Sequence, residues 1–115
     1  MIEILPVIVF VCAVWAFGNG ILHDIFVIRG HTGGYDRELL RLLMDGHILL
    51  TCGAVYAIAF FLLKEENSAG LYLCTLAATS MIVYCLMIYP FLKSIVTLVM
   101  NVAALILSLI ATVRL

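Results

Sequence analysis

The chain has few charged residues and no excess of either sign. Only 11% of its 115 residues are Asp, Glu, Lys or Arg, against about a quarter in an average soluble domain. Six basic side chains against seven acidic ones leave no basic face of the kind that nucleic-acid binding requires. Hydrophobic residues make up 66% of the chain. This composition excludes a water-soluble globule, a disordered segment and a nucleic-acid-binding protein.

The sequence also lacks the common catalytic and metal-binding motifs. Its four cysteines stand singly, without a Cys-x-x-Cys pair, so the sequence indicates neither a zinc site nor a redox dithiol. There is no His-Glu-x-x-His motif, no nucleophile elbow and no phosphate-binding loop of the Walker type. We therefore assign no catalytic residue, and we expect the cysteines to be small packing residues inside helices.

What the sequence does have is four long apolar stretches. A helix needs about 20 apolar residues to cross the hydrocarbon of a bilayer, and such stretches run over residues 4–28, 39–63, 69–89 and 91–113. The first stretch has no basic residue before it and no clear cleavage site after it, so we interpret it as a span rather than a signal peptide. We expect an all-α, integral membrane four-helix bundle of up-down-up-down topology, with residues 1–115 forming one domain.

The basic residues predict an orientation for this bundle. Four spans place both termini and the 64–68 loop on one side, and the 29–38 and 89–93 loops on the other. The second side carries four of the six Lys and Arg residues, namely Arg29, Arg37, Arg41 and Lys93. By the positive-inside rule, we expect the 29–38 and 89–93 loops to face the cytoplasm.

Small residues at helical spacing indicate where the helices approach one another. Helices in lipid pack closely through Gly, Ala, Ser and Thr. The pairs Ala16–Gly20 and Gly53–Ala57 lie on the first and second spans, and Ala104, Ser108 and Thr112 form a stripe on the fourth. These patterns predict tight helix packing and carry no functional meaning of their own.

Polar residues are concentrated in one segment. All three histidines and four of the seven acidic residues fall between residues 18 and 47, although each ionisable group at mid-membrane costs about 2.5–3.5 kcal/mol on insertion scales. At ~1.5 Å per residue, the polar residues at the end of the first span and those at the start of the second lie at comparable depths in the membrane. We predict a polar pocket in one leaflet, to which all four helices contribute. The candidate ligand-binding residues are Asn19, His23, Asp24, Arg41, Asp45, His47, Lys93 and Asn101.

Simpler structural roles are open for several of these residues. Glu38, Arg41 and Asp45 have the spacing of an ion-pair ladder along one helix, and Asp24 can pair with Arg29 or Arg41. His31, in a glycine-rich loop, is expected to be solvated. Asn101 is as well explained by a hydrogen bond between helices as by ligand binding.

Three functions fit these observations. The first is binding or transport of a small ligand, ion or proton by a His and Asp pocket, with transport requiring a homo-oligomer. The second is an accessory or assembly subunit of a larger membrane complex. The third is a haem or metal protein that uses His23 and His47 as ligands. An enzyme that acts on lipid is the least supported, since no nucleophile stands out. Membrane lipid and either a homo-oligomer or a membrane-protein partner are the expected contacts.

The layout of the chain resembles two groups of small four-span proteins. Small multidrug transporters have a similar length, but they place a glutamate in the middle of the first helix, and this chain has none there. Proteins of the DoxX type open their second helix with a charged turn, which is similar to residues 35–41. Both likenesses concern layout, so no family is assigned and no site residue is carried over.

Overall fold

The fold is that of a computed structural model, which describes residues 3–114. Within this range the chain forms four α-helices and no strand: α1 (Ile4–Gly30), α2 (Arg37–Lys64), α3 (Ala69–Ile88) and α4 (Ile95–Arg114). Each helix is long and apolar enough to cross a membrane. The prediction of an all-helical protein with four long apolar helices is confirmed.

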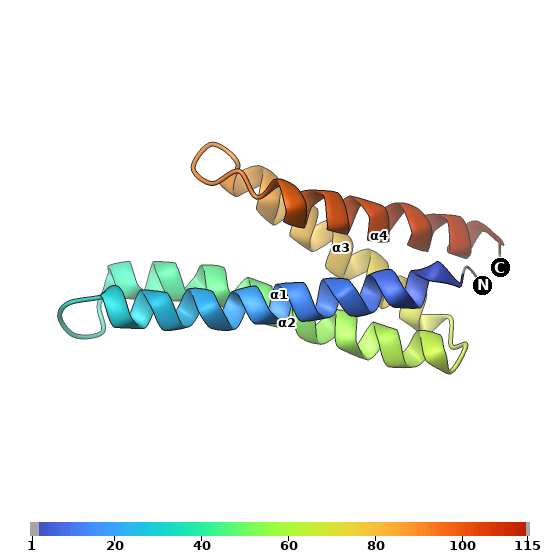
Figure 1. Cartoon of the computed structure of the whole chain (residues 1–115), viewed down its shortest axis with the longest axis horizontal. Coiled ribbons are helices and arrows are strands. Elements are labelled where there is room, and N and C mark those ends of the chain that lie inside the picture. Colours follow the sequence, from blue (N-terminus) through green and yellow to red (C-terminus); the bar gives the residue numbers. More distant parts are fainter. Residues whose placement is uncertain (1–2, 115) are drawn as a thin grey trace.

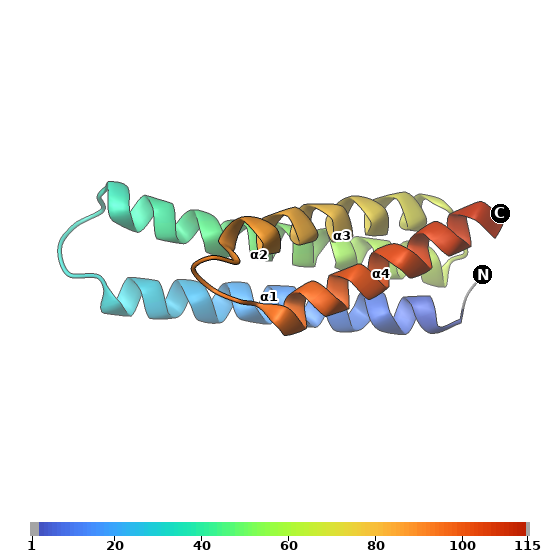
Figure 2. The same ribbon diagram turned by 90° about the horizontal axis from the view of Figure 1, so that it is seen from above.

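The helices form a ring of neighbours. α1 packs on α2, α2 on α3 and α3 on α4, and α4 returns to α1. Figure 1 shows the two chain ends at one end of the molecule and the loop between α1 and α2 at the other. Both views show that the α1–α2 hairpin extends beyond the α3–α4 hairpin at that loop end (Figures 1 and 2).

The unequal helix lengths explain this overhang. α1 and α2 have 27 and 28 residues, and α3 and α4 have 20 each. At ~1.5 Å per residue the longer pair measures about 40 Å and the shorter pair about 30 Å, and a bilayer hydrocarbon core is about 30 Å thick. The length of the shorter helices therefore matches the thickness of the hydrocarbon core. The extra length of α1 and α2 lies at the end of the molecule that carries the histidines.

The helix boundaries differ from the expected spans mainly between α3 and α4. The sequence places this break at Tyr89–Pro90, whereas in the structure α4 begins at Ile95. Pro90 cannot donate a backbone hydrogen bond and disfavours helix in the residue before it. Phe91 and Leu92 then donate their backbone N–H groups to the Ile88 carbonyl. A reversal between antiparallel helices needs these extra turn residues.

Close packing of α1 on α2 depends on glycines that face the neighbouring helix. A Cβ added to Gly20 would lie 2.9 Å from Leu50 Cγ, and one added to Gly53 would lie 2.9 Å from the Phe17 backbone nitrogen. Contacts this short leave no room for a side chain, so the predicted role of the small residues in packing is confirmed on these two helices. On α4, Ala104 and Ser108 are buried as well.

Candidate functional site

The α1–α2 interface contains a carboxylate at a third such glycine. An ideal Cβ on Gly46 would overlap Asp24 Oδ1 and would lie 2.6 Å from Asp24 Cγ. Since only hydrogen fits there, Asp24 lies directly against the backbone of α2. Its side chain keeps 25% of its surface exposed. The structure thus places an acidic group between two apolar helices, at a contact that requires glycine.

His23 is the side chain that accompanies this carboxylate. Its Nδ1 lies 3.4 Å from Asp24 Oδ1, and 31% of the His23 side chain is exposed. The ring can donate a hydrogen bond to the carboxylate through a protonated Nδ1, and it forms an ion pair when both nitrogens carry protons. The pair combines two groups that can exchange a proton with each other.

A second carboxylate, that of Asp45, comes directly before Gly46 on α2. Asp45 is half-buried, and it lies near enough to the Tyr84 hydroxyl of α3 for the two groups to interact electrostatically. Tyr84 stands four residues before the end of α3 at Ile88, or about 6 Å along the helix. The level of Asp45 is therefore close to one end of the shorter helices. We call His23, Asp24 and Asp45 the seam cluster.

The expected ion pairs with arginine do not form. Among residues 3–114, the ion pairs are His23–Asp24 and His31–Asp36. The predicted ladder through Glu38, Arg41 and Asp45 is therefore wrong, and so is the predicted pairing of Asp24 with Arg29 or Arg41. Long arginine side chains near a helix end extend toward water rather than bend back along the helix, and Arg41 is exposed. The carboxylates of the seam cluster thus have no Lys or Arg partner within the described residues.

The other predicted site residues of α1, α2 and the α3–α4 connection lie outside this cluster. Asn19 is exposed and donates to the Trp15 carbonyl at 2.7 Å, so its amide bonds to its own helix and not to the His23 ring. His47 is exposed, with Nε2 3.4 Å from Thr51 Oγ1. Lys93 is exposed, and its Nζ lies 5.6 Å from the centre of the Tyr89 ring.

Asn101, the remaining candidate, lies in the core of the bundle. It is 3% exposed, its Nδ2 donates to the Thr97 carbonyl at 2.7 Å, and its Oδ1 accepts a hydrogen bond from the fully buried Tyr56 hydroxyl. Tyr56 and Gly46 are ten residues apart on α2, or about 15 Å. Asn101 therefore belongs to a separate structural contact between α2 and α4.

The sequence reasoning did not single out Tyr56. The signal was available, because a tyrosine in the middle of an apolar span needs a partner for its hydroxyl, and Asn101 is the polar side chain at mid-depth on the last span. A second core contact joins α3 to α4. Ser108 Oγ lies 2.8 Å from Cys74 Sγ and 2.7 Å from the Ala104 carbonyl. All four cysteines are buried and free, which agrees with their predicted packing role.

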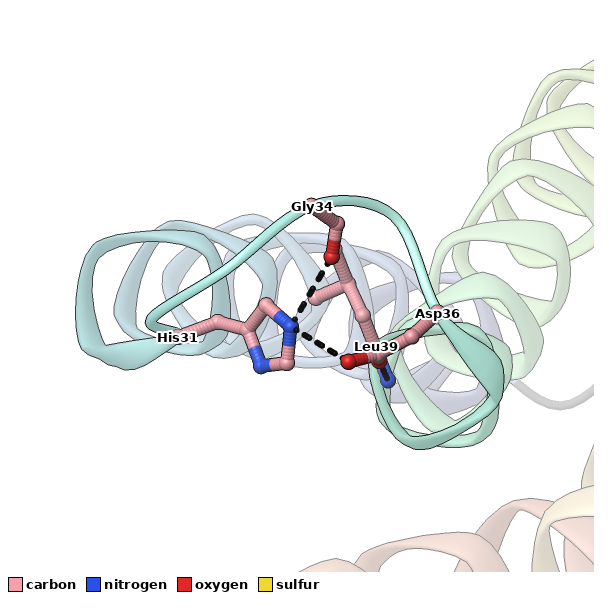
Figure 3. A network of polar contacts seen from close by, with 4 residues as sticks. All are labelled: His31, Gly34, Asp36 and Leu39. Atoms are coloured by element: carbon pink, nitrogen blue, oxygen red, sulfur yellow. Dashed lines mark hydrogen bonds and ion pairs between the residues drawn. The ribbon is translucent and has the colours of Figure 1, made fainter.

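The loop between α1 and α2 has a polar network of its own (Figure 3). His31 Nε2 lies 3.1 Å from the Gly34 carbonyl and 3.2 Å from Asp36 Oδ2, and the His31 side chain is only 10% exposed. The expectation that His31 is solvated is therefore wrong. Both neighbours accept hydrogen bonds, so this arrangement suits the tautomer that carries its proton on Nε2. This network fixes the turn and is not part of the seam cluster.

Asp36 also begins α2. Its Oδ1 accepts a hydrogen bond from the Leu39 backbone N–H at 2.9 Å, which is the standard N-cap contact. This bond, together with the nearby His31 ring, lowers the pKa of Asp36 below its ordinary value. Gly33 has a φ of 113°, a conformation that other residues rarely adopt.

The described residues contain no group of three or more His, Cys, Asp or Glu side chains that could hold a metal ion. His23 turns to Asp24, whereas His47 lies beside Thr51 on its own helix. This arrangement gives no support to a haem or metal held between the two histidines.

Comparisons of the chain with protein-family models, with characterised proteins and with solved structures give no match.

Proposed function

We propose that this is an integral membrane protein that binds and exchanges a proton or a small cation at Asp24, beside His23. The observation that supports this proposal is the position of the Asp24 carboxylate, which lies against Gly46 between two apolar helices without a Lys or Arg partner in the described residues. A carboxylate at this position can be neutralised by a proton or balanced by a cation.

His23 is the second group beside this carboxylate that can carry a proton. An imidazole titrates around neutral pH, and His23 Nδ1 lies 3.4 Å from Asp24 Oδ1. A cation that reaches Asp24 competes with the protonated ring for the carboxylate. The half-buried Asp45 and the exposed His47 flank Gly46 on α2 and add two further ionisable groups near Asp24. Binding of the cation is therefore expected to depend on pH.

We propose that the seam cluster lies near one membrane surface, since Tyr84 stands four residues before the end of α3. Protons and cations reach it from that side. Transport to the other side requires a pathway that a single bundle of four helices has little room for, so we propose that the transporting form is a homo-oligomer in contact with membrane lipid. Native mass spectrometry of the purified protein measures this state, and a stoichiometric heterologous subunit would instead favour the role of an assembly subunit.

A proton-flux experiment tests the function. The protein is reconstituted into vesicles that contain a pH-sensitive dye, and a pH step is applied. We expect Asp24→Asn to reduce the protein-dependent flux to the level of empty vesicles, because the amide cannot take up a proton at Asp24. Asp36→Asn is the control, since it removes an acidic group outside the seam cluster. Equal flux in wild type and Asp24→Asn would contradict the proposal.

We also propose that the 29–38 and 89–93 loops face the cytoplasm and that the termini lie on the opposite side. Arg29, Arg37, Arg41 and Lys93 lie toward the loop end of the molecule, and Lys64 and Arg114 lie toward the other end. Labelling of single cysteines in intact cells tests this orientation. In a chain with its four cysteines replaced by serine or alanine, we expect Asn67→Cys to react with a membrane-impermeant reagent and Thr32→Cys not to react.

A further inference from the structure

An open apolar groove runs along the outer side of the α1–α2 contact. Its volume is about 630 Å³, within the range of small-molecule pockets. Phenylalanines from both helices surround a floor of small residues. The lining residues are Phe10, Ala13, Val14, Phe17, Gly18, Gly53, Ala54, Ala57, Ile58, Phe60 and Phe61. None of these side chains is polar, so the groove suits a hydrocarbon chain and offers nothing to a polar ligand.

The groove and the seam cluster lie on the same helix–helix seam. At the end of the groove nearer the α1–α2 loop, Phe17 contacts Gly53. Seven residues further along each helix, Asp24 contacts Gly46. Two turns of an α-helix take about seven residues, so the two contacts repeat on the same faces of both helices. The carboxylate of Asp24 therefore stands at the end of the line that the groove follows.

The exposed face of α2 continues in the same direction. His47 precedes Ala54 by seven residues, and Ala54 precedes Phe61 by seven. These three residues are exposed and lie on one stripe of the helix. The face thus passes from wholly apolar at Phe61 to polar at His47, which lies beside the residue that Asp24 contacts. An occupant of this face meets hydrocarbon along most of its length and polar groups at one end.

The charge of the polar end selects the occupant. Asp24 supplies a carboxylate that has no Lys or Arg partner in the described residues, so it favours a positively charged head group over a neutral or an anionic one. From Asp24 to Phe10 is fourteen residues of α1, or about 21 Å, which suits a long alkyl chain. A head group at Asp24 also lies near the membrane surface, where head groups belong.

We propose that the α1–α2 seam binds a single-chain amphiphile with a primary or substituted ammonium head group. Its alkyl chain fills the groove, and its ammonium group donates hydrogen bonds to Asp24. This inference rests on the proposed cation binding at Asp24, and it names the class of cation as a lipophilic organic amine.

Native mass spectrometry of the purified full-length chain in detergent tests this inference, with hexadecylamine as the probe. Hexadecan-1-ol is the matched neutral compound, since it has the same alkyl chain. Because only the amine forms a charge-assisted hydrogen bond to the carboxylate, we expect the wild type to bind the amine about tenfold more tightly than the alcohol. We expect Asp24→Asn, which keeps the size of the side chain, to bring this ratio to about one while alcohol binding persists.

A tryptophan pair tests the groove. Ala54→Trp fills the exposed groove floor, and we expect it to reduce the binding of both compounds. Val83→Trp, at an exposed position of α3 outside the groove, is expected to leave both unchanged. The melting temperature of each variant reports whether it folds. If Ala54→Trp does not fold, Phe61→Ala is expected to weaken the binding of both compounds by removing one wall of the groove.

Three results would overturn the inference. The first is equal binding of amine and alcohol by the wild type. The second is an equal effect of the two tryptophan variants on binding. The third is a dimeric protein that binds no amine, because a second copy then covers the groove. If amine binding fails while Asp24 still titrates in the infrared spectrum, the proposed proton binding stands and the amphiphile is wrong. If Asp24 does not titrate either, both proposals fail.

Discussion

At the scale of single residues, the buried contact between Tyr56 and Asn101 shows how this protein handles polarity inside its core. The Tyr56 hydroxyl donates to Asn101 Oδ1, and the Asn101 amide donates to the Thr97 carbonyl. Within the described residues, no buried side-chain nitrogen or oxygen lacks a hydrogen-bond partner. A satisfied pair of this kind holds α2 and α4 in one register, and its role is structural.

We expect Tyr56→Phe to destabilise the protein, because it leaves Asn101 Oδ1 without its donor. The expected loss in the free energy of unfolding is about 1–2 kcal/mol. A double-mutant cycle with Asn101→Leu, measured by reversible unfolding in mixed micelles, isolates the pair. A coupling energy of about 0.6–1.7 kcal/mol is expected, as for hydrogen bonds between membrane helices. Strictly additive effects would mean that the two side chains do not interact.

Asp36 gives a prediction about pH. Its pKa lies below the ordinary value of 3.8, because the carboxylate accepts the Leu39 N–H bond and faces His31. A pKa that is lower in the folded than in the unfolded state stabilises the fold above the unfolded pKa. That contribution is lost as the pH falls through the folded pKa. We expect the carboxyl carbon of Asp36 to titrate below pH 3.8 in an NMR experiment.

His31→Ala separates the two causes of this shift. The Leu39 N–H bond is the larger cause, and it persists when the ring is removed. The midpoint for Asp36 is then expected to rise part of the way toward its ordinary value. A midpoint at the ordinary value in the wild type would show that neither contact persists in solution.

At the scale of helices, the close packing of α1 on α2 requires glycine at the positions where the partner helix comes nearest. Gly46→Ala places a methyl group on the Asp24 carboxylate. We expect a loss of about 1–3 kcal/mol in the free energy of unfolding, the usual cost of overpacking. Reduced proton flux is expected as well, because Asp24 is displaced from the seam.

Gly18 provides the matched control for this substitution. It lies within α1 too, but a Cβ added there meets no atom within 4 Å. Gly18→Ala is therefore expected to leave the stability unchanged or to raise it by about 0.5–1 kcal/mol, since alanine favours helix more than glycine does. Equal losses in both variants would show that Gly46 is sensitive for a reason other than Asp24.

The sequence predicts the helices well and their polar contacts poorly. Apolar runs with short polar breaks are sufficient to locate four helices, because a helix needs a run of about 20 apolar residues to cross a bilayer. The direction of a side chain at a helix end is decided by its neighbours in space. Periodicity allows Glu38, Arg41 and Asp45 to pair, yet these residues form no ion pair. Conversely, His31 lies in a polar loop, yet only 10% of its side chain is exposed and its ring contacts Gly34 and Asp36.

At the scale of the whole molecule, the unequal hairpins decide which candidate residues meet. The α1–α2 hairpin extends past α3 and α4 at the loop end (Figure 2), so the parts of α1 and α2 nearest their connecting loop are not surrounded by all four helices. Lys93 at the start of the last span was predicted to reach them, but its described contact is with Tyr89. Sequence spacing gives depth along each helix and does not give the overhang between hairpins.

The central claim is that Asp24 takes up and releases a proton within the α1–α2 seam. Infrared difference spectroscopy of the protein in lipid nanodiscs, recorded as a function of pH, observes this directly through the carbonyl band of a protonated carboxyl group. We predict a band that appears as the pH falls and that is missing in Asp24→Asn but present in Asp36→Asn and Asp45→Asn. Titration curves of wild type and Asp24→Asn that superimpose would contradict the account.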